Sequence, residues 1–483
     1  MQNWLTKRVD LTPERTAITY AGQQLSFLQL SQAVEKLAQQ LANKLDDNPR
    51  VAILTTNTLT GYEMILALQQ LGRTVVLLNY RLAPTEIGYQ LNDADVTQVL
   101  QTDSYTESLS HVQQLTFSEI TAAPLAHVEF QSNFDLDQVT TIMYTSGTTG
   151  KPKGVEQTFG NHFYSAVGSA LNLGLSADDA WVAAVPIFHI SGLSIMMRSL
   201  IYGMEVRLYE RFDVEQINAD IMNGKVTTIS VVPTMLKSLL NELPVGATYP
   251  SRFKTMLLGG GPSDLATLNK AQLAGVGVVQ SYGMTETASQ IIALDPKDAL
   301  PKMGSVGKAL FPVELRVAHM TTEGVGRVQV KSPTLTVGYL NKMDKYEASF
   351  EDGWFDTGDM GYQDAEGYLY LVGREGDMIS SGGENIFPNE IEDVYQQLPE
   401  IKEISVIGVS DEHWGAVPVA VIEFNQGQEL THQALVHFGR QHLAHYKVPK
   451  TYYRLTNDWP RTASGKIQRY LLQKNTNLDD KIL

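Results

Sequence analysis

Residues 144–155 form the segment that most constrains what this chain can fold into. They read Tyr-Thr-Ser-Gly-Thr-Thr-Gly-Lys-Pro-Lys-Gly-Val and follow an apolar run that ends at Ile142 and Met143. We therefore expect the segment to leave a β-strand as a loop. Backbone N–H groups, hydroxyl donors and lysine charges on a glycine-rich loop suit the oxygens of a polyphosphate. The segment predicts a phosphate-binding loop, and the alternative is a flexible surface turn.

The spacing within this segment excludes a Walker A loop. That motif has four residues between its glycines, followed by a Lys-Ser/Thr pair that opens a helix. Here two residues separate Gly147 from Gly150, and Pro152 disfavours a helix at Lys151. The phosphate loop must therefore belong to another fold.

Length and composition limit the remaining classes of protein. A chain of 483 residues is too long for one compact core and predicts two or more domains. The formal net charge of -16 argues against binding nucleic acid or an anionic membrane surface, because both require a broad basic face. The absence of cysteine excludes disulfides, thiolate zinc sites and a catalytic thiol. With no bilayer-spanning apolar stretch and no signal-peptide core, we expect a cytoplasmic protein without membrane insertion.

Strand-like and helix-like segments alternate through the first three hundred residues, which predicts α/β layering with largely parallel sheets. Ser26 and Gln29 form a candidate capping box, and apolar residues recur after them at helical spacing. The expected strands are residues 17–20, 51–55, 74–78, 181–185, 206–209, 227–232 and 255–258.

The texture changes from about Val313, where shorter and more β-rich pieces appear. A compact α+β stretch follows Gly376, with strands expected over residues 404–409 and 417–424 and a helix over 433–443. We place a hinge at Gly376, which divides the chain into residues 1–375 and 376–483. Residues 475–483 are expected to form a frayed tail.

The phosphate loop resembles the signature of the adenylate-forming superfamily, which includes acyl- and aryl-CoA ligases. Five later motifs appear in that superfamily's order, at residues 259–262, 281–287, 354–359, 380–386 and 461–467. The resemblance implies an α/β fold with a large N-terminal domain of layered subdomains, one of them β-rich. It also implies a small, mobile α+β lid at the C-terminus.

The resemblance implies that several of these motifs bind ATP. Glu286 is a hard oxygen donor suited to Mg²⁺, and Tyr282 can stack on a purine. Asp359 and Arg374 match the ribose contacts, although a surface ion pair is the alternative. Turns next to helices are the alternative for residues 259–262 and 281–287. The residues expected to contact the nucleotide are Thr145, Ser146, Gly147, Thr148, Thr149, Gly150, Lys151, Gly259, Gly260, Gly261, Ser281, Tyr282, Gly283, Met284, Thr285, Asp359, Arg374 and Lys466.

The lid motifs imply two half-reactions. Lys466 would bridge the substrate carboxylate and the α-phosphate while an acyl adenylate forms, although most lysines are simply solvated. Gly382, Gly383 and Glu384 match the loop that lines the pantetheine tunnel for coenzyme A. Rotation of the lid would replace Lys466 at the reacting atoms by the pantetheine loop. Many relatives carry Asp or Lys at the hinge, so Gly376 leaves open how the hinge is locked.

The acid-binding side begins with Phe-His-Ile-Ser-Gly at residues 188–192. His189 stands where amino-acid-activating domains usually place Asp, which argues against an amino-acid substrate; a core-packed histidine is the alternative. Arg198 is the only charge in the apolar residues 193–203, and a buried cation needs an anion. It would meet a second carboxylate on the substrate, unless it snorkels to the surface. The expected acid-binding residues are His189, Ser191, Gly192, Arg198, Gly260, Gly283 and Ser289, and the expected catalytic residues are Thr145, His189, Glu286 and Lys466.

The acid side, with residues 157–162 and 282–291, is most similar to ligases that join an aromatic dicarboxylic acid to coenzyme A in menaquinone biosynthesis. The alternatives are another aryl- or medium-chain acyl-CoA ligase, a luciferase-type monooxygenase, or a non-catalytic nucleotide-binding protein on the same fold. The expected cofactors are ATP, Mg²⁺ and coenzyme A. The oligomeric state stays open, a homo-oligomer included.

Overall fold

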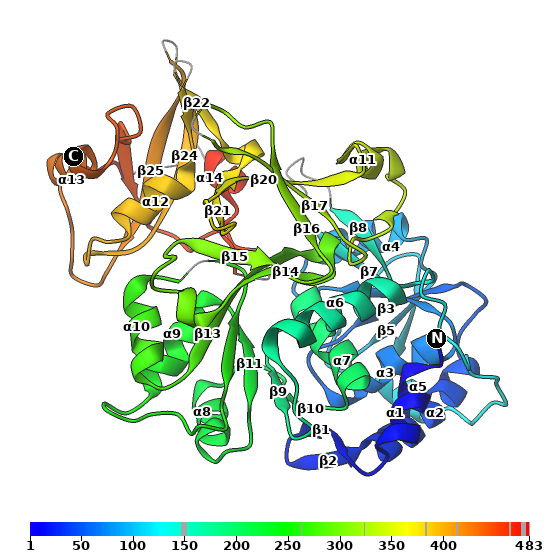
Figure 1. Ribbon diagram of the computed structural model, residues 1–483. Helices are drawn as coiled ribbons and strands as arrows, with labels where there is room; N and C mark the ends of the chain where they lie inside the picture. Colours follow the sequence, from blue (N-terminus) through cyan, green and yellow to red (C-terminus); the bar gives the residue numbers. More distant parts are fainter. Residues whose placement is uncertain are drawn as a thin grey trace. The chain divides into compact units, whose positions relative to one another are not determined.

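The computed structural model describes residues 1–145, 152–261, 263–322, 324–381, 384–411, 414–462, 465–474 and 480–482. The chain packs as two compact units, the first made of residues 1–315 and 330–354 and the second of residues 316–329 and 355–483. The expected division after residue 375 falls inside the second unit and stays a prediction. Each unit is built from strands and helices that Figure 1 labels in chain order.

The strands of the first unit include every strand expected before residue 260, with ends that differ by at most two residues. The strands of this unit are β1 (Thr16–Tyr20), β2 (Gln23–Ser26), β3 (Arg50–Leu54), β4 (Thr74–Leu78), β5 (Gln98–Gln101), β6 (Gln113–Thr116), β7 (Val139–Thr145), β8 (Lys153–Thr158), β9 (Ala180–Ala183), β10 (Glu205–Leu208), β11 (Thr228–Val231), β12 (Thr255–Leu258), β13 (Gly277–Met284), β14 (Ser289–Leu294), β15 (Ser305–Ala309), β18 (Gly338–Tyr339) and β19 (Phe350–Glu351).

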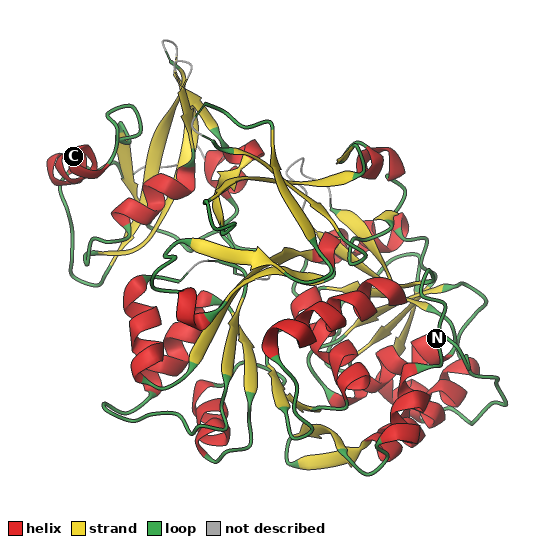
Figure 2. Cartoon of the chain, in the orientation of Figure 1, coloured by secondary structure: helices red, strands yellow, loops and turns green. Residues whose placement is uncertain are grey.

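These strands form two sheets whose centres are parallel, as the alternation predicted. One has the order β18-β8-β7-β4-β3-β5-β6, and the other runs β15-β14-β13-β12-β11-β9-β10-β1-β2. Antiparallel pairs occur where β7 meets β8, β13 meets β14 and β1 meets β2. Parallel strands need helical crossovers, so helices cover both sheets (Figure 2).

The helices of the first unit are α1 (Trp4–Leu11), α2 (Phe27–Ala42), α3 (Leu59–Gln70), α4 (Pro84–Asp93), α5 (Phe117–Thr121), α6 (Phe159–Leu173), α7 (Ile190–Tyr202), α8 (Val214–Met222), α9 (Pro233–Glu242), α10 (Leu265–Leu273) and α11 (Met343–Glu347), with the 3₁₀ turns η1 (Thr285–Thr287) and η2 (Pro296–Asp298). The predicted capping box opens α2, where Ser26 accepts from the Gln29 backbone and the Gln29 side chain accepts from Ser26 N–H. Helix α7 contacts β9, β10 and β14, while α9 contacts β11 and β12.

The strands that lie in the second unit or run into it are β16 (Glu314–Ala318), β17 (Gly326–Lys331), β20 (Trp354–Gln363), β21 (Leu369–Arg374), β22 (Ile379–Ser381), β23 (Glu384–Ile386), β24 (Ile401–Asp411), β25 (Gly415–Phe424) and β26 (Thr451–Arg454), and the helices are α12 (Pro388–Tyr395), α13 (His432–His442), α14 (Arg469–Lys474) and the 3₁₀ turn η3 (Glu375–Asp377). Strands β24 and β25 and helix α13 confirm the elements expected after the hinge. Tyr395, the last residue of α12, forms a hydrogen bond of 2.6 Å with Tyr452 on β26, and both side chains belong to the core of the second unit.

The expectation of a frayed tail is wrong for residues 480–482. Lys481 forms an antiparallel bridge with Tyr453, and Ile482 N donates to Tyr452 O at 2.9 Å. Ile482 is 8% exposed and belongs to the core of the second unit. Pairing with the edge strand β26 and burial of one apolar side chain outweigh the entropy that usually frays a chain end.

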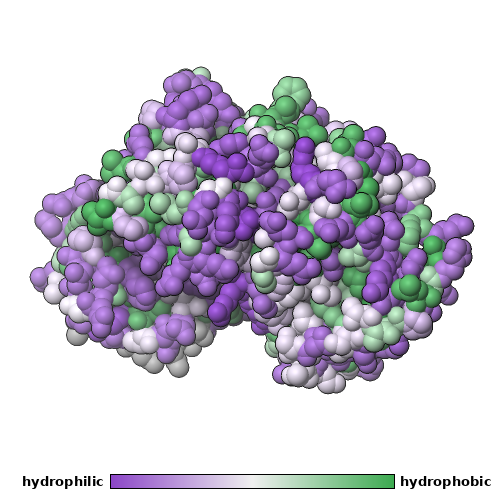
Figure 3. Space-filling model, turned by 90° about the horizontal axis from the view of Figure 1, so that it is seen from below, coloured by the Kyte–Doolittle hydropathy of each residue, from purple (hydrophilic) through white to green (hydrophobic). Residues whose placement is uncertain are grey.

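Much of the surface is polar. Figure 3 shows one face on which hydrophilic side chains predominate and hydrophobic ones are scattered among them. In the part of the chain that the structure describes, no helix is both long enough and apolar enough to cross a membrane.

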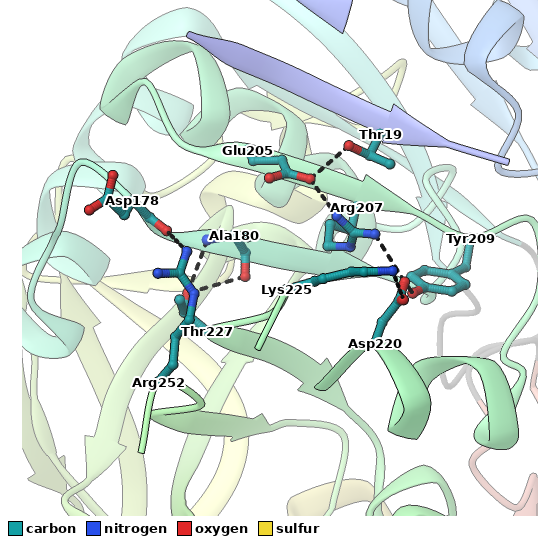
Figure 4. A network of polar contacts seen from close by, with 10 residues as sticks. All are labelled: Thr19, Asp178, Ala180, Glu205, Arg207, Tyr209, Asp220, Lys225, Thr227 and Arg252. Carbon is teal, nitrogen blue, oxygen red and sulfur yellow. Dashed lines mark hydrogen bonds and ion pairs between the residues drawn. The ribbon is translucent and has the colours of Figure 1, made fainter. Parts of the chain in front are cut away.

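A polar network joins β1, β10 and α8 in the first unit (Figure 4). Arg207 pairs with Glu205 at 2.8 Å and with Asp220 at 3.0 Å, and Tyr209 donates its hydroxyl to Asp220 at 2.6 Å. Burial by itself raises the pKa of Asp220, but hydrogen bonds from Tyr209, Lys225 and Arg207 outweigh it and lower that pKa below the ordinary value. Asp220 therefore fixes α8 to the sheet as a carboxylate.

Replacing Asp220 with Ala should destabilise the protein, because Arg207 and Tyr209 then lose a half-buried acceptor. The free energy of unfolding in urea should fall by about 1–3 kcal/mol. The matched change Lys225→Ala removes an exposed partner of the same carboxylate and should cost only about 0.2–1 kcal/mol. A lowered pKa gives stability that is present above the unfolded value and lost as pH falls through the folded value, so the Asp220→Ala effect should shrink below about pH 4. An effect that is constant down to pH 3 would contradict this role.

Candidate active site

The phosphate loop joins two paired strands. Strand β7 ends at Thr145 and β8 begins at Lys153, and these two residues are partners in the antiparallel register. The prediction that the segment leaves a strand is therefore confirmed, and the segment also runs into a second strand, β8, which was not predicted. The expected phosphate ligands Ser146, Gly147, Thr148, Thr149, Gly150 and Lys151 lie outside the described residues.

Glu286 lies beside this hairpin in η1 and is 9% exposed. Tyr339 donates its hydroxyl to Glu286 Oε1 at 3.0 Å, and Lys153 Nζ lies 3.9 Å from the same oxygen. Gln157 Nε2 donates to Thr285 O at 2.6 Å, which ties η1 to β8. The predicted metal ligand and the end of the phosphate loop are thus held together.

The residues present suit a magnesium ion bound together with a polyphosphate. The contacts of Glu286 with Tyr339 and Lys153 both go to Oε1. Among the described residues no group of three or more His, Asp or Glu side chains could hold a metal. Magnesium usually takes only one or two carboxylates and completes its shell with waters and substrate phosphates, so a single carboxylate is what this chemistry requires.

The triple glycine and the tyrosine motif lie at the carboxyl ends of neighbouring strands. Leu258 at the end of β12 pairs in parallel with Gln280 in β13. Ser281 donates its hydroxyl to Leu258 O at 2.9 Å, next to Gly259, and Gly260 has a φ of +83° that favours glycine. In the motif at residues 281–287, for which a helix-starting turn was the alternative, residues 281–284 continue strand β13 and residues 285–287 form the 3₁₀ turn η1.

Gly283 allows β13 and β14 to approach closely. A Cβ atom on Gly283 would lie 2.0 Å from Ser289 O, closer than any side chain could tolerate. Ser289 itself has a φ of +110°, an uncommon conformation for a residue with a side chain. The two expected pocket residues Gly283 and Ser289 therefore form one tightly built corner.

His189 and Gly192 lie at the start of α7. Asn57 Oδ1 accepts from Ile187 N at 2.9 Å and fixes the segment before the helix. A Cβ on Gly192 would lie 2.3 Å from Pro186 O, so the first turn of α7 packs against that backbone. His189 Nε2 is buried and has no hydrogen-bond partner in the part of the chain that the structure describes. Burial, followed by the charge of Arg81, lowers the pKa of His189 to about 4 and leaves it neutral at pH 7.

Arg198 lies in the middle of α7 and is 1% exposed, so the alternative in which it snorkels to the surface is wrong. Its Nη2 donates to Ser289 Oγ at 3.2 Å, and its guanidinium carbon lies 5.3 Å from the ring centre of Trp181. Among the described residues, its Nε has no hydrogen-bond partner and no carboxylate forms an ion pair with it. A buried cation with one neutral acceptor and an aromatic face can accept an anion.

The surroundings of Arg198 are neutral. His162 Nε2 lies 3.0 Å from Thr141 Oγ1, while its Nδ1 is buried without a partner. Burial, followed by the charge of Arg198, lowers the pKa of His162 to about 3. Burial also lowers the pKa of Arg198 itself, an effect that Tyr202 opposes. Of the described pair His162 and Arg198, the arginine therefore carries the charge.

In the second unit, Asp359 on β20 and Arg374 on β21 are register partners, and Arg374 Nε lies 3.0 Å from Asp359 Oδ1. The ion pair that was the alternative therefore exists, between a buried Asp359 and an exposed Arg374, and the ribose contacts stay a prediction. Lys466 is exposed, yet desolvation by its surroundings and the charge of Arg374 lower its pKa, while Asp359 raises it. The three predicted residues share one electrostatic environment.

Two expected coenzyme A residues, Gly382 and Gly383, and the side chain of Glu384 lie outside the described residues. Sequence reasoning missed other residues that the structure brings to the site. Lys153 lay inside the quoted motif and could have been found by its charge. Tyr339 and Trp181 have no local signal, because each meets its partner only through the tertiary fold.

Comparison with protein families decides the class. Residues 5–340 match the model of the AMP-binding enzyme, and residues 390–466 match that of the AMP-binding enzyme C-terminal domain. The chain belongs to the AMP-binding enzyme family. A 2-succinylbenzoate–CoA ligase of Listeria monocytogenes is 47% identical over 98% of this chain and 99% of its own length. The enzyme of that name from Geobacillus sp. is 45% identical, over 98% and 97% of the two chains.

Solved structures of AMP-binding enzymes agree. The o-succinylbenzoate CoA synthetase of Bacillus subtilis, in complex with its acyl-adenylate intermediate, matches with a TM-score of 0.95 and 40% identity over 100% of this chain and 99% of its own. Its complex with ATP and magnesium matches with a TM-score of 0.92 and 41% identity over 98% and 100%. The predicted superfamily and α/β fold class are confirmed.

Replacing Gly192 with Ala should lower stability, because the added methyl group meets Pro186 O and the backbone of Ile187. We expect a loss of about 1–3 kcal/mol in the free energy of unfolding, the usual cost of overpacking. Gly88→Ala is the matched control: it lies in α4, where an added Cβ meets nothing within 4 Å, and it should stabilise slightly. Equal stability of the two variants in urea would show that α7 does not pack as described.

Proposed function

We propose that the chain is a 2-succinylbenzoate–CoA ligase, which joins this acid to coenzyme A through an acyl adenylate in menaquinone biosynthesis. The observation that carries the proposal is the buried Arg198, which has no described acidic partner. The acid has two carboxylates, one on the succinyl chain and one on the aromatic ring. The succinyl carboxylate reacts, and the ring carboxylate supplies the anion that Arg198 lacks.

In the first half-reaction a carboxylate oxygen attacks the α-phosphorus of ATP and pyrophosphate leaves. Two anions must approach, so catalysis depends on charge neutralisation and positioning. A magnesium ion, when bound, neutralises phosphate charge. Thr145 would act as a hydroxyl donor and Glu286 as the metal ligand. Asp359 and Arg374 would bind the ribose, and the ammonium of Lys466 would neutralise the carboxylate and the α-phosphate.

In the second half-reaction the thiolate of coenzyme A attacks the acyl carbonyl and AMP leaves with the bonding electrons. The loop that contains Gly382, Gly383 and Glu384 would line the path of pantetheine, which is narrow and rich in amides. Lys466 and this loop serve different half-reactions, so a rotation about Gly376 would exchange them. In this proposal residues 376–483 act as the lid and residues 1–375 bind ATP and the acid.

Neutral groups around the acid also fit the proposal. His189 stays uncharged at pH 7, so it can hydrogen-bond the substrate without adding a second cation. Ser289 and Gly283 close the corner beside Arg198. We expect the reaction to occur in the cytoplasm, where ATP and coenzyme A are available. The oligomeric state, a homo-oligomer included, remains to be measured.

Replacing Arg198 with Leu should impair use of 2-succinylbenzoate, because the ring carboxylate would then be buried against an apolar side chain. Truncating one partner of a buried charged pair costs about 2–5 kcal/mol, so kcat/KM should fall roughly thirty-fold or more. The exposed Arg252, changed to Leu, is the matched control and should leave the kinetics unchanged. If KM and turnover of the Arg198 variant equal those of the parent, this role of Arg198 is wrong. A panel with benzoate and medium-chain acids, read by pyrophosphate release, separates the rival ligases.

Replacing Gly376 with Pro should spare adenylate formation and slow thioester formation. Gly376 lies in the 3₁₀ turn η3, whose φ a proline can adopt, so the variant should keep the described conformation. In that conformation the charges of Arg374 and Asp359 act on the pKa of Lys466. The two half-reactions are measured separately by pyrophosphate exchange and by thioester formation from supplied adenylate. Gly376→Ala restricts the backbone less and should slow thioester formation less; equal loss of both half-reactions in the proline variant would refute the hinge.

A further inference from the structure

The described residues of the lysine-bearing turn are Arg461, Thr462, Gly465, Lys466 and Ile467, of which Arg461, Gly465 and Lys466 are exposed. Arg461 and Ile467 form an antiparallel bridge, Thr462 N donates to Lys466 O at 2.7 Å, and Lys466 N donates to Thr462 Oγ1 at 3.1 Å. Gly465 has a φ of +87°, which favours glycine at the reversal. These bonds are internal to the turn, while Ile467 is half-buried and packs against the core cluster that includes Trp459 and Leu472. Lys466 itself is exposed, so its position depends on how the two ends of the turn are attached.

Arg461 attaches the first end of the turn to a strand. Its Nη1 donates to Gly465 O at 2.8 Å, one residue before Lys466, and its Nη2 pairs with the carboxylate of Glu403 on β24. The strand itself is anchored, since Lys402 Nζ and Trp459 Nε1 both bind the carboxylate of Glu423, the register partner of Glu403. One planar guanidinium therefore braces the turn internally and connects it to a sheet.

Arg469 attaches the other end. Its Nη1 lies 3.0 Å from Asp377, directly after the hinge, and its Nη2 lies 2.6 Å from Glu392 on α12. Nε also donates to Glu392, at 3.2 Å, and Asn389 accepts from Nη2. The partners of Arg469 described here all follow Gly376 in the chain. Paired, multidentate arginine contacts of this kind hold geometry as well as charge.

We propose that Arg461 and Arg469 are positioning residues for Lys466, suspending its turn at both ends so that the ammonium is held where the adenylate forms. The proposal rests on the proposed function, in which Lys466 serves only the first half-reaction. Arg461 is the cleaner test, because it touches only the lysine-bearing turn and β24. Arg469 also binds α12 and the residue after the hinge, so its loss should affect both half-reactions.

Arg461→Gln should lower the rate of adenylate formation roughly ten- to a hundred-fold, the cost of misplacing a reacting group by about 1 Å. Thioester formation from supplied acyl adenylate should be unchanged, because Lys466 has no part in it. Arg461→Lys should recover part of the rate through the Glu403 pair. The charge-swapped double variant Arg461→Glu with Glu403→Arg should recover more than either single change. Arg454→Gln, which removes an exposed arginine paired with Glu429 and Asp480, is the matched control and should behave as the parent.

Equal loss of both half-reactions in Arg461→Gln, or no loss in either, would overturn the proposal. If Arg461→Gln fails to fold, Glu403→Gln tests the same attachment from the strand side and must show the same split. Failure of the proposed function looks different: the parent protein itself would then form no adenylate with 2-succinylbenzoate. A normal parent with an unsplit variant refutes only the positioning role.

Discussion

The interaction on which the acid site depends is one that the protein leaves incomplete. Arg198 is buried in an apolar helix, contacts one serine hydroxyl and the face of Trp181, and has no described ion-pair partner. Burying a guanidinium in this way is costly, and the cost is recovered only when an anion arrives. His162, which senses the charge of Arg198, is neutral and therefore adds no second cation beside it. The site is therefore a buried positive charge that a substrate carboxylate can neutralise.

Close backbone contacts fix the elements that carry Arg198 and Ser289. Gly283 lets β14 approach β13, and Gly192 lets α7 begin against the Pro186 backbone. Ser289, next to Gly283, has a positive φ, and its hydroxyl accepts a hydrogen bond from Arg198. Strained conformations of this kind persist only where the surrounding structure fixes them. The same corner thus explains why small residues recur in the motifs of the acid side.

Local signals predicted much of this molecule, and long-range contacts supplied the rest. The parallel strands and the Ser26 capping box follow from periodicity and turn chemistry. No local pattern could show that Tyr339 would hold Glu286, because 53 residues separate them. Trp181 beneath Arg198 and Ile482 in the core are likewise products of tertiary packing. Conversely, the sequence motifs alone identified Asp359, Arg374 and Lys466, and the fold brings these three residues into one electrostatic environment.

The central claim is tested most directly with the unmodified protein and two acids. 2-Succinylbenzoate and 4-oxo-4-phenylbutanoate share the reacting carboxyl chain and differ only in the ring carboxylate. Both are offered with ATP and magnesium, and exchange of labelled pyrophosphate into ATP is measured over a range of acid concentrations. The account predicts efficient exchange with the dicarboxylic acid and a large loss, mainly in apparent affinity, with the other. Equal exchange with both acids, or none with either, would contradict it.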